Sequence, residues 1–274
     1  MFSKKLSVLG LIGVWLLLLL TGCGKGGSDN TVQKFASLTI AGSTSVQPLM
    51  EELAKSYQEK NSNVRIMVQG GGSSAGIKSV AAGSADLGMS SRELKDSEKN
   101  GLEPLEIAKD GIAVIVNSTN GVKELTLQQV ADIFSGKITN WKDVGGADKK
   151  IVVVTREEGS GTRGAFEEIV MKDEKIMTSA ITQNTTGSVH QTVAQDESSI
   201  GYISIGNLDD KVKAVAIDNV EANEDNVKQG TYKISRPFLV ISKGEPSPEA
   251  KAFLEWILGD EGQSIVAKKF ISVK

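Results

Sequence analysis

The segment with the clearest chemistry combines an arginine, two hydroxyl residues and two glycines. It reads Arg-Glu-Glu-Gly-Ser-Gly-Thr and follows a run of apolar β-forming residues. Arg156 supplies a planar guanidinium, and Ser160 and Thr162 supply hydroxyl donors for an oxyanion. Gly159 and Gly161 allow a tight turn and a close approach of a ligand to the backbone. A helical pattern follows, so we predict an oxyanion cradle at a helix N-terminus, where backbone N–H groups favour negative charge.

A simpler interpretation of the same residues stays open. Serine and threonine are routine N-cap residues, because their side-chain oxygens accept the unpaired N–H groups of the first helical turn. Taken alone, Gly-Ser-Gly-Thr is more often a helix cap than a binding site. Other segments of the chain have to decide between the two interpretations.

Three more segments share the same design, each rich in small hydroxyl residues and glycine and each following a predicted strand. They are Ile40-Ala41-Gly42-Ser43-Thr44-Ser45, Gln69-Gly70-Gly71-Gly72-Ser73-Ser74-Ala75-Gly76 and Asp86-Leu87-Gly88-Met89-Ser90-Ser91-Arg92. Ligands of open α/β sheets bind at the carboxyl ends of the strands. Independent helix caps would not need so many glycines. We therefore expect these segments and the Arg156 segment to share one binding centre.

Strand and helix signals alternate along the chain and must position these loops. Apolar runs predict strands at 38–40, 64–68, 85–89, 111–117, 151–154, 201–203, 212–217 and 236–241. Helical periodicity predicts helices at 46–60, 73–82, 127–134, 163–171, around Val189, at 248–258 and at 262–268. Such alternation favours an α/β fold with mostly parallel strands, and the restart of the pattern near Leu125 favours two α/β lobes.

Composition argues against several classes of function. The formal net charge is −3 and becomes −5 once Lys4 and Lys5 are removed, which argues against nucleic acid as a partner. The chain has one histidine, His190, so a histidine-rich metal site is impossible, and we expect His190 to be a surface or cap residue. Gly159-Ser160-Gly161 lacks the first glycine of the hydrolase elbow. We expect no enzyme activity, no metal and no cofactor.

The N-terminus has the features of a processing segment. Lys4 and Lys5 precede an almost wholly apolar run that ends in Leu-Thr-Gly-Cys, the form of a bacterial lipobox. We predict a lipoprotein signal peptide over residues 1–22, acylation (palmitate) of Cys23 and a flexible tether over 23–35. The globular body would then be held at the extracytoplasmic face of the cell membrane.

The four hydroxyl and glycine segments occur in the order seen in a known family. Together with Ser135-Gly136-Lys137-Ile138-Thr139-Asn140-Trp141 and Ile200-Gly201-Tyr202, they resemble the phosphate-binding lipoproteins of bacterial phosphate ABC transporters, in the short Gram-positive form. The resemblance covers nearly all of residues 38–274. It implies a two-lobed periplasmic-binding-protein-like fold (type II), whose lobes are joined by two crossover strands and close on the ligand. We place lobe 1 at 36–115 plus 233–274 and lobe 2 at 116–232.

Carried over position by position, the resemblance implies a set of phosphate ligands. They are Thr44, Ser45 through its backbone, Ser73, Arg156, Ser160, Gly161 and Thr162. The resemblance also implies that Glu158 is the carboxylate that orients Arg156. Arg92 either binds the anion or braces the site.

One departure from the family affects selectivity. Better-known members carry an aspartate at the position of Ser91, where it accepts a hydrogen bond from protonated phosphate. Phosphate carries a proton at neutral pH and sulfate carries none, so a carboxylate acceptor favours phosphate. Ser91 can accept or donate and would discriminate less. We predict Asp110 as the replacement acceptor, with a turn aspartate that caps its own backbone as the alternative.

The resemblance implies capture of inorganic phosphate and its delivery to the permease subunits of an ABC transporter for import. We expect a monomer that breaks no bond and a hinge near residues 114–118 and 230–236. The alternatives are a receptor for sulfate, molybdate or another tetrahedral oxyanion, an extracellular phosphatase or hydrolase, and an adhesion or scaffold lipoprotein.

Overall fold

The computed structural model describes residues 35–274, which belong to one compact unit. The predicted signal peptide, Cys23 and nearly all of the predicted tether lie outside the described residues. Among the described residues, no helix is long and apolar enough to cross a membrane.

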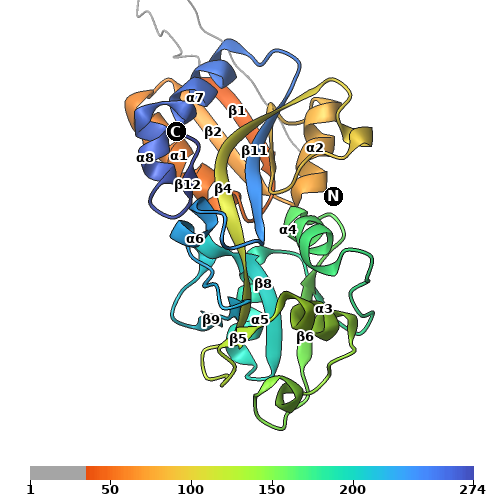
Figure 1. Ribbon diagram of the computed structural model, residues 1–274. Helices are drawn as coiled ribbons and strands as arrows, with labels where there is room; N and C mark the ends of the chain where they lie inside the picture. The colour runs from red at the N-terminus through yellow and green to blue at the C-terminus, as the bar shows by residue number, and fades with distance from the viewer. Residues whose placement is uncertain (1–34) are drawn as a thin grey trace, which may run out of the picture. The chain divides into compact units, whose positions relative to one another are not determined.

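One mixed β-sheet runs through the described body. Its strand order is β2-β1-β3-β11-β4-β8-β6-β7, and β9 and β12 each pair with β4. These strands are β1 (Ala36–Gly42), β2 (Val64–Gly70), β3 (Leu87–Ser90), β4 (Leu102–Asn117), β6 (Val152–Arg156), β7 (Ile181–Gln183), β8 (Ser199–Ser204), β9 (Val212–Ala214), β11 (Ser235–Lys243) and β12 (Ile271–Ser272). The short strands β5 (Glu124–Leu125) and β10 (Ala216–Ile217) pair with each other. As Figure 1 shows, β4 passes from one half of the body into the other.

Helices cover the sheet in both halves of the body (Figure 1). The N-terminal half contains α1 (Gln47–Lys60) and α2 (Ser73–Ala82), and the C-terminal helices α7 (Pro248–Leu258) and α8 (Asp260–Val266) return to it. The other half contains α3 (Leu127–Ser135), α4 (Gly161–Phe166) with a π-helical continuation to Met171, α5 (Thr186–Gln195) and α6 (Glu224–Lys228). The predicted helices at 73–82, 127–134 and 248–258 are confirmed within a residue at each end.

Two main apolar cores lie on either side of the crossover. One is built around Ile40, Leu53, Phe238 and Phe253, and the other around Val114, Phe134, Phe166 and Tyr202. On β4, Ala108 belongs to the first core and Ile112 to the second. On the segment that returns through β11, Ile234 belongs to the second core and Phe238 to the first. The body is thus two-lobed with two crossover segments, as the resemblance implies. The exact lobe boundaries at 115/116 and 232/233 stay predictions.

The expectation of mostly parallel strands was wrong at the centre of the sheet. β1 pairs in parallel with β2 and β3, and β6 pairs in parallel with β7 and β8. The crossover strand β4, however, is antiparallel to β11, β8, β9 and β12. Each lobe keeps the parallel α/β pattern that alternation predicts, whereas strands that carry the chain between lobes in opposite directions must pair antiparallel.

Two strand boundaries also differ from the prediction. β4 begins at Leu102 rather than at Gly111. The prediction missed its first half, because Glu103, Pro104 and Glu106 interrupt the apolar pattern there. The predicted strand at 212–217 is divided at Val215 into β9 and β10, which pair with different partners. The first difference places Asp110 inside β4, paired with Arg236 of β11, rather than in a turn before the strand.

Candidate functional site

The loop between β1 and α1 brings two hydroxyl residues, Thr44 and Ser45, into contact with the other lobe. Ser45 Oγ lies 2.8 Å from Thr162 Oγ1 and 2.9 Å from Thr186 Oγ1, so loops far apart in the sequence meet here. Thr44 Oγ1 accepts a hydrogen bond from the backbone N–H of Thr186 at 3.2 Å. Gly42 permits this entry, because its φ is +148° and a Cβ there would lie 2.1 Å from the carbonyl oxygen of Met89.

The loop between β2 and α2 places Ser73 in the same cluster. Ser73 is fully buried, and its hydroxyl accepts a hydrogen bond from the backbone N–H of Ser91 at 3.1 Å. A Cβ added at Gly161 would lie 2.2 Å from Ser73 Oγ and 2.6 Å from Ser91 Oγ. The glycine at 161 therefore allows the loop of lobe 2 to approach both serines.

Helices α1 and α2 begin at this cluster without side-chain caps. Their N-cap residues, Val46 and Gly72, make no side-chain cap hydrogen bond. The hydroxyls of the two loops thus do not serve as caps of these helices. The N–H groups of Gln47 and Ser74 donate to the carbonyls of Ser43 and Gly159, and the positive ends of both helix dipoles still favour an anion at the cluster.

One hydroxyl of Gly-Ser-Gly-Thr caps a helix, and because a hydroxyl that accepts a hydrogen bond can still donate one, the role of Ser160 as a ligand stays a prediction. Ser160 is the N-cap of α4, and its side chain accepts the N–H of Arg163 at 3.2 Å. Thr162, in contrast, turns to Ser45 across the lobes. Both side chains are buried. One segment therefore supplies a helix cap and a member of the hydroxyl cluster.

Arg156 is the buried cation of the cluster, and its orienting carboxylate is Glu157 rather than Glu158. Arg156 Nε and Nη2 donate to the two carboxylate oxygens of Glu157, both at 3.0 Å. Glu158 is exposed. β6 ends at Arg156, and a turn in which the Ser160 N–H bonds the Glu157 carbonyl follows. The turn brings the Glu157 side chain back to Arg156, which strict strand alternation would not predict.

Thr186 and Ser43 belong to the cluster but were not predicted. Thr186 Oγ1 accepts a hydrogen bond from Arg156 Nη1 at 3.3 Å and also meets Ser45. Ser43 Oγ donates to Ser91 Oγ at 2.9 Å. A signal for Thr186 exists in the sequence, because Thr-Thr-Gly-Ser forms the start of a helix that follows a strand. The short strand β7 that precedes it is too weak a pattern to recognise.

The loop after β3 explains the role of Arg92. Its guanidinium donates to both oxygens of Glu98, at 2.7 and 2.8 Å, and to Ser74 Oγ at 3.1 Å. The Glu98 pKa is lowered, chiefly by the hydrogen bond from Arg92. Of the two roles weighed for Arg92, the contacts favour bracing of the loops.

The side chain of Asp110 makes no hydrogen bond to a member of the hydroxyl cluster in the described body. It is fully buried, and it accepts hydrogen bonds from Ser204 Oγ at 2.8 Å and from Arg236 Nε and Nη2 at 3.1 and 2.9 Å. Burial raises the pKa of Asp110, and the charge of Arg236 opposes this shift. Its predicted role as an acceptor for the ligand stays a prediction.

The residues that converge come from both lobes and include most of the predicted ligands. Thr44, Ser45, Ser73, Ser91, Arg156, Gly161 and Thr162 are joined by direct hydrogen bonds or close contacts, together with Ser43 and Thr186. The arrangement offers hydroxyl groups, uncapped helix ends and one ion-paired guanidinium to a small anion.

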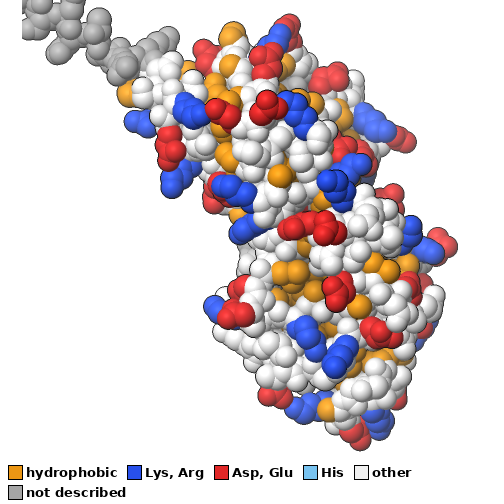
Figure 2. Space-filling model, turned by 60° about the vertical axis from the view of Figure 1, so that its left-hand side comes forward, with side chains coloured by type: hydrophobic (Ala, Val, Ile, Leu, Met, Phe, Trp, Pro, Cys, Tyr) orange, Lys and Arg blue, Asp and Glu red, His pale blue; other side chains and the backbone are white. Residues whose placement is uncertain are grey.

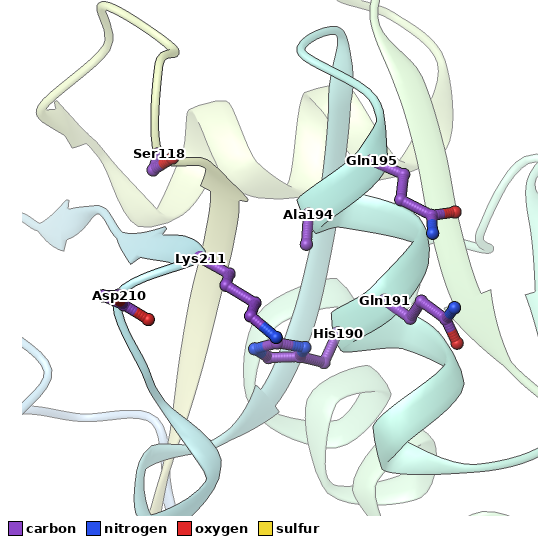
Figure 3. Close-up of a pocket in the computed structure, with 7 residues that line it drawn as sticks. All are labelled: Ser118, His190, Gln191, Ala194, Gln195, Asp210 and Lys211. Atoms are coloured by element: carbon purple, nitrogen blue, oxygen red, sulfur yellow. The ribbon is translucent and has the colours of Figure 1, made fainter.

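A surface pocket of about 620 Å³ lies elsewhere, beside α5. It is lined by Ser118, His190, Gln191, Ala194, Gln195, Asp210 and Lys211, and Figure 3 shows Lys211 and His190 extending toward each other. His190 Nε2 lies 2.7 Å from an Asp209 carboxylate oxygen. The pocket contains no member of the hydroxyl cluster, so it is distinct from the candidate anion site.

Comparisons with known proteins agree with this geometry. A model of the PBP superfamily domain matches residues 27–261. The phosphate-binding protein PstS of Bacillus subtilis is 33% identical over 279 residues, which cover 96% of this chain and 92% of that protein. PstS of Staphylococcus epidermidis is likewise 33% identical, with 95% of this chain and 87% of that protein covered.

Solved structures give the same result. A Clostridium perfringens structure, named for a phosphate ABC transporter substrate-binding protein with bound phosphate, is 48% identical, with a TM-score of 0.85 over 87% of this chain and 100% of that chain. An ABC-type phosphate transport receptor from Vibrio cholerae is 38% identical, with a TM-score of 0.72 over 85% of this chain and 99% of that chain.

Proposed function

Because this chain belongs to the PBP superfamily and, within it, to the family of the PstS phosphate-binding proteins, we propose that it captures inorganic phosphate and delivers it to an ABC transporter permease for import. The observation that carries the proposal is the meeting of hydroxyl groups from both lobes around Arg156. A receptor that closes on its ligand needs such donors from both sides.

Phosphate would be held by donors rather than by an excess of positive charge. Glu157 already pairs with Arg156, so this pair carries no net charge. Taking an anion out of water is costly unless many hydrogen bonds replace its hydration. The serine and threonine hydroxyls and the uncapped ends of α1 and α2 would supply those hydrogen bonds.

The subunit would bind without breaking bonds. A hydrolase would need a base beside its nucleophilic hydroxyl. His190 is paired with Asp209 on the surface of lobe 2, and no hydrogen bond joins it to the hydroxyl cluster in the described body. Within residues 35–274, no group of three or more His, Cys, Asp or Glu side chains could hold a metal ion. These placements favour a receptor over a phosphatase.

We also propose that the body is held at the extracytoplasmic face of the cell membrane by acylation of Cys23. The support is the sequence Leu-Thr-Gly-Cys after a basic and apolar N-terminal run. A monomer would be sufficient, because the hydroxyl cluster is built from one chain. Figure 2 shows positive and negative side chains interspersed over one face of the body, an ordinary surface for a water-exposed domain.

Isothermal titration of the full-length chain, purified in detergent, tests the proposal. We expect phosphate to bind with a stoichiometry of about one per chain and more tightly than sulfate or molybdate. A chain that binds sulfate or molybdate more tightly would be a receptor for another tetrahedral oxyanion. Absence of binding by all of these anions would exclude the proposed function.

A further inference from the structure

The most deeply buried ion pair in the described body lies where two strands cross between the lobes. Asp110 on β4 and Arg236 on β11 are register partners, and their side chains are 0% and 1% exposed. A buried ion pair of this kind gives little net stability, because the loss of hydration offsets the attraction between the charges. Its position therefore calls for another explanation.

The pair receives contacts from both sides of the crossover. Arg236 directs two N–H groups to Asp110, and its remaining arm, Nη1, donates to the backbone carbonyl of Ser91 at 3.3 Å. Ser204, at the end of β8, donates its hydroxyl to Asp110 at 2.8 Å. The Arg236 guanidinium also lies 5.4 Å from the centre of the Phe238 ring, which further restricts it.

Ser91 connects this pair to the hydroxyl cluster. Its hydroxyl accepts from Ser43, and its backbone N–H donates to Ser73. A movement of the Ser91 backbone would displace both contacts. Burial lowers the pKa of Arg236, and the charge of Asp110 opposes this shift.

The charges near the cluster cancel in pairs. Asp110 neutralises Arg236, and Glu157 neutralises Arg156. With no net charge to attract an anion, binding depends on how accurately the donors are placed. A group that fixes Ser91 would therefore act on affinity without touching the ligand.

We propose that Asp110 and Arg236 form a positioning pair for anion capture, in which Arg236 fixes the Ser91 backbone and Asp110 holds Arg236. This inference depends on the proposed phosphate function. It assigns Asp110 a different role from that of a direct acceptor for the phosphate proton. A direct acceptor distinguishes phosphate from sulfate, whereas a positioning pair affects all tetrahedral oxyanions alike.

The Asp110→Asn variant of the full-length chain separates the two roles. Phosphate affinity is measured by titration and sulfate affinity by competition against phosphate. For a positioning pair, we expect both affinities to fall by the same factor, roughly tenfold or more. A loss confined to phosphate, or a gain in sulfate binding, would show a direct acceptor and overturn the proposal.

Arg236→Lys provides a second test in case Asp110→Asn leaves Arg236 unpaired and unfolds the protein. A lysine keeps the charge beside Asp110 but replaces with a single nitrogen the planar fork that contacts Asp110 and the Ser91 carbonyl together. We expect an equal loss of affinity for both anions. Unchanged affinity for both would contradict the proposal.

Tyr232→Phe is the matched control. Tyr232 is also buried at the crossover, where its hydroxyl donates to the Ile112 carbonyl at 2.8 Å. We expect lower thermal stability with unchanged phosphate affinity. A loss of affinity as large as that of Arg236→Lys would mean that any disturbance of the crossover weakens binding, and the specific role of the pair would be refuted.

Binding by the unmutated chain distinguishes a failure of this proposal from a failure of the proposed phosphate function. If the parent binds neither phosphate nor sulfate, both proposals fail. If the parent binds phosphate and the Asp110 and Arg236 variants bind equally well, the phosphate function stands and the positioning pair fails.

Discussion

At the scale of single residues, Thr186 links the charged and uncharged parts of the candidate site. Its hydroxyl accepts from Arg156 Nη1 and meets Ser45 of the other lobe. Valine has a shape similar to threonine but no hydroxyl, so Thr186→Val removes the acceptor for an N–H group of the buried Arg156. The loss of a hydrogen bond to a charged group costs about 1.5–3 kcal/mol. We expect phosphate affinity to fall roughly ten- to hundredfold, mostly through faster dissociation, measured by titration and stopped-flow mixing. Thr186→Ser keeps the hydroxyl and should retain most of the affinity; equal binding by Thr186→Val and the parent would exclude this role.

At the scale of elements, glycines let the loops and helices of the two lobes come together. A Cβ at Gly164 on α4 would lie 3.1 Å from Arg92 Cδ. Arg92 cannot easily move, because Glu98 and Ser74 hold its guanidinium. In Gly164→Ala, we expect weaker phosphate binding, by roughly three- to tenfold, although alanine favours the helix itself by about 1 kcal/mol. Titration should then show a lower phosphate affinity, whereas thermal unfolding should show a higher melting temperature.

The control for this element is Gly187→Ala in α5. The nearest atom that its added Cβ would meet is Thr185 Oγ1 at 3.9 Å, an ordinary contact. We expect unchanged phosphate affinity for this variant. Equal losses in both glycine variants would indicate a general effect of alanine rather than obstruction between the lobes.

At the scale of the whole described body, the lobes are joined by two crossover segments and touch through hydrogen bonds between their loops. Ser74 N–H donates to the Gly159 carbonyl at 3.0 Å, in addition to the hydroxyl contacts. These contacts are few compared with the two separate cores, so a ligand that supplies further contacts should shift the lobes toward closure. Small-angle scattering should show a smaller radius of gyration on addition of phosphate, and sulfate at equal concentration serves as the comparison. An unchanged radius would argue against closure.

Local sequence patterns determined the elements and the composition of the loops. Apolar periodicity predicted α2 and α7 closely, because such patterns record which face of a helix is buried. Glycine and hydroxyl residues after strands predicted which loops carry ligand groups, because these residue types permit close approach and donate hydrogen bonds. The restart of the pattern near Leu125 already favoured two lobes, and the resemblance added the two crossover strands between them.

Contacts between distant segments were decided by the tertiary structure. Pairing of Arg156 with Glu157 instead of Glu158 follows from the turn after β6, and the convergence on Thr186 follows from the meeting of two lobes. The antiparallel centre of the sheet and the Asp110–Arg236 pair depend on where β11 lies beside β4. Sequence patterns report local burial and backbone preference, whereas such pairings depend on segments that are brought together only when the chain folds.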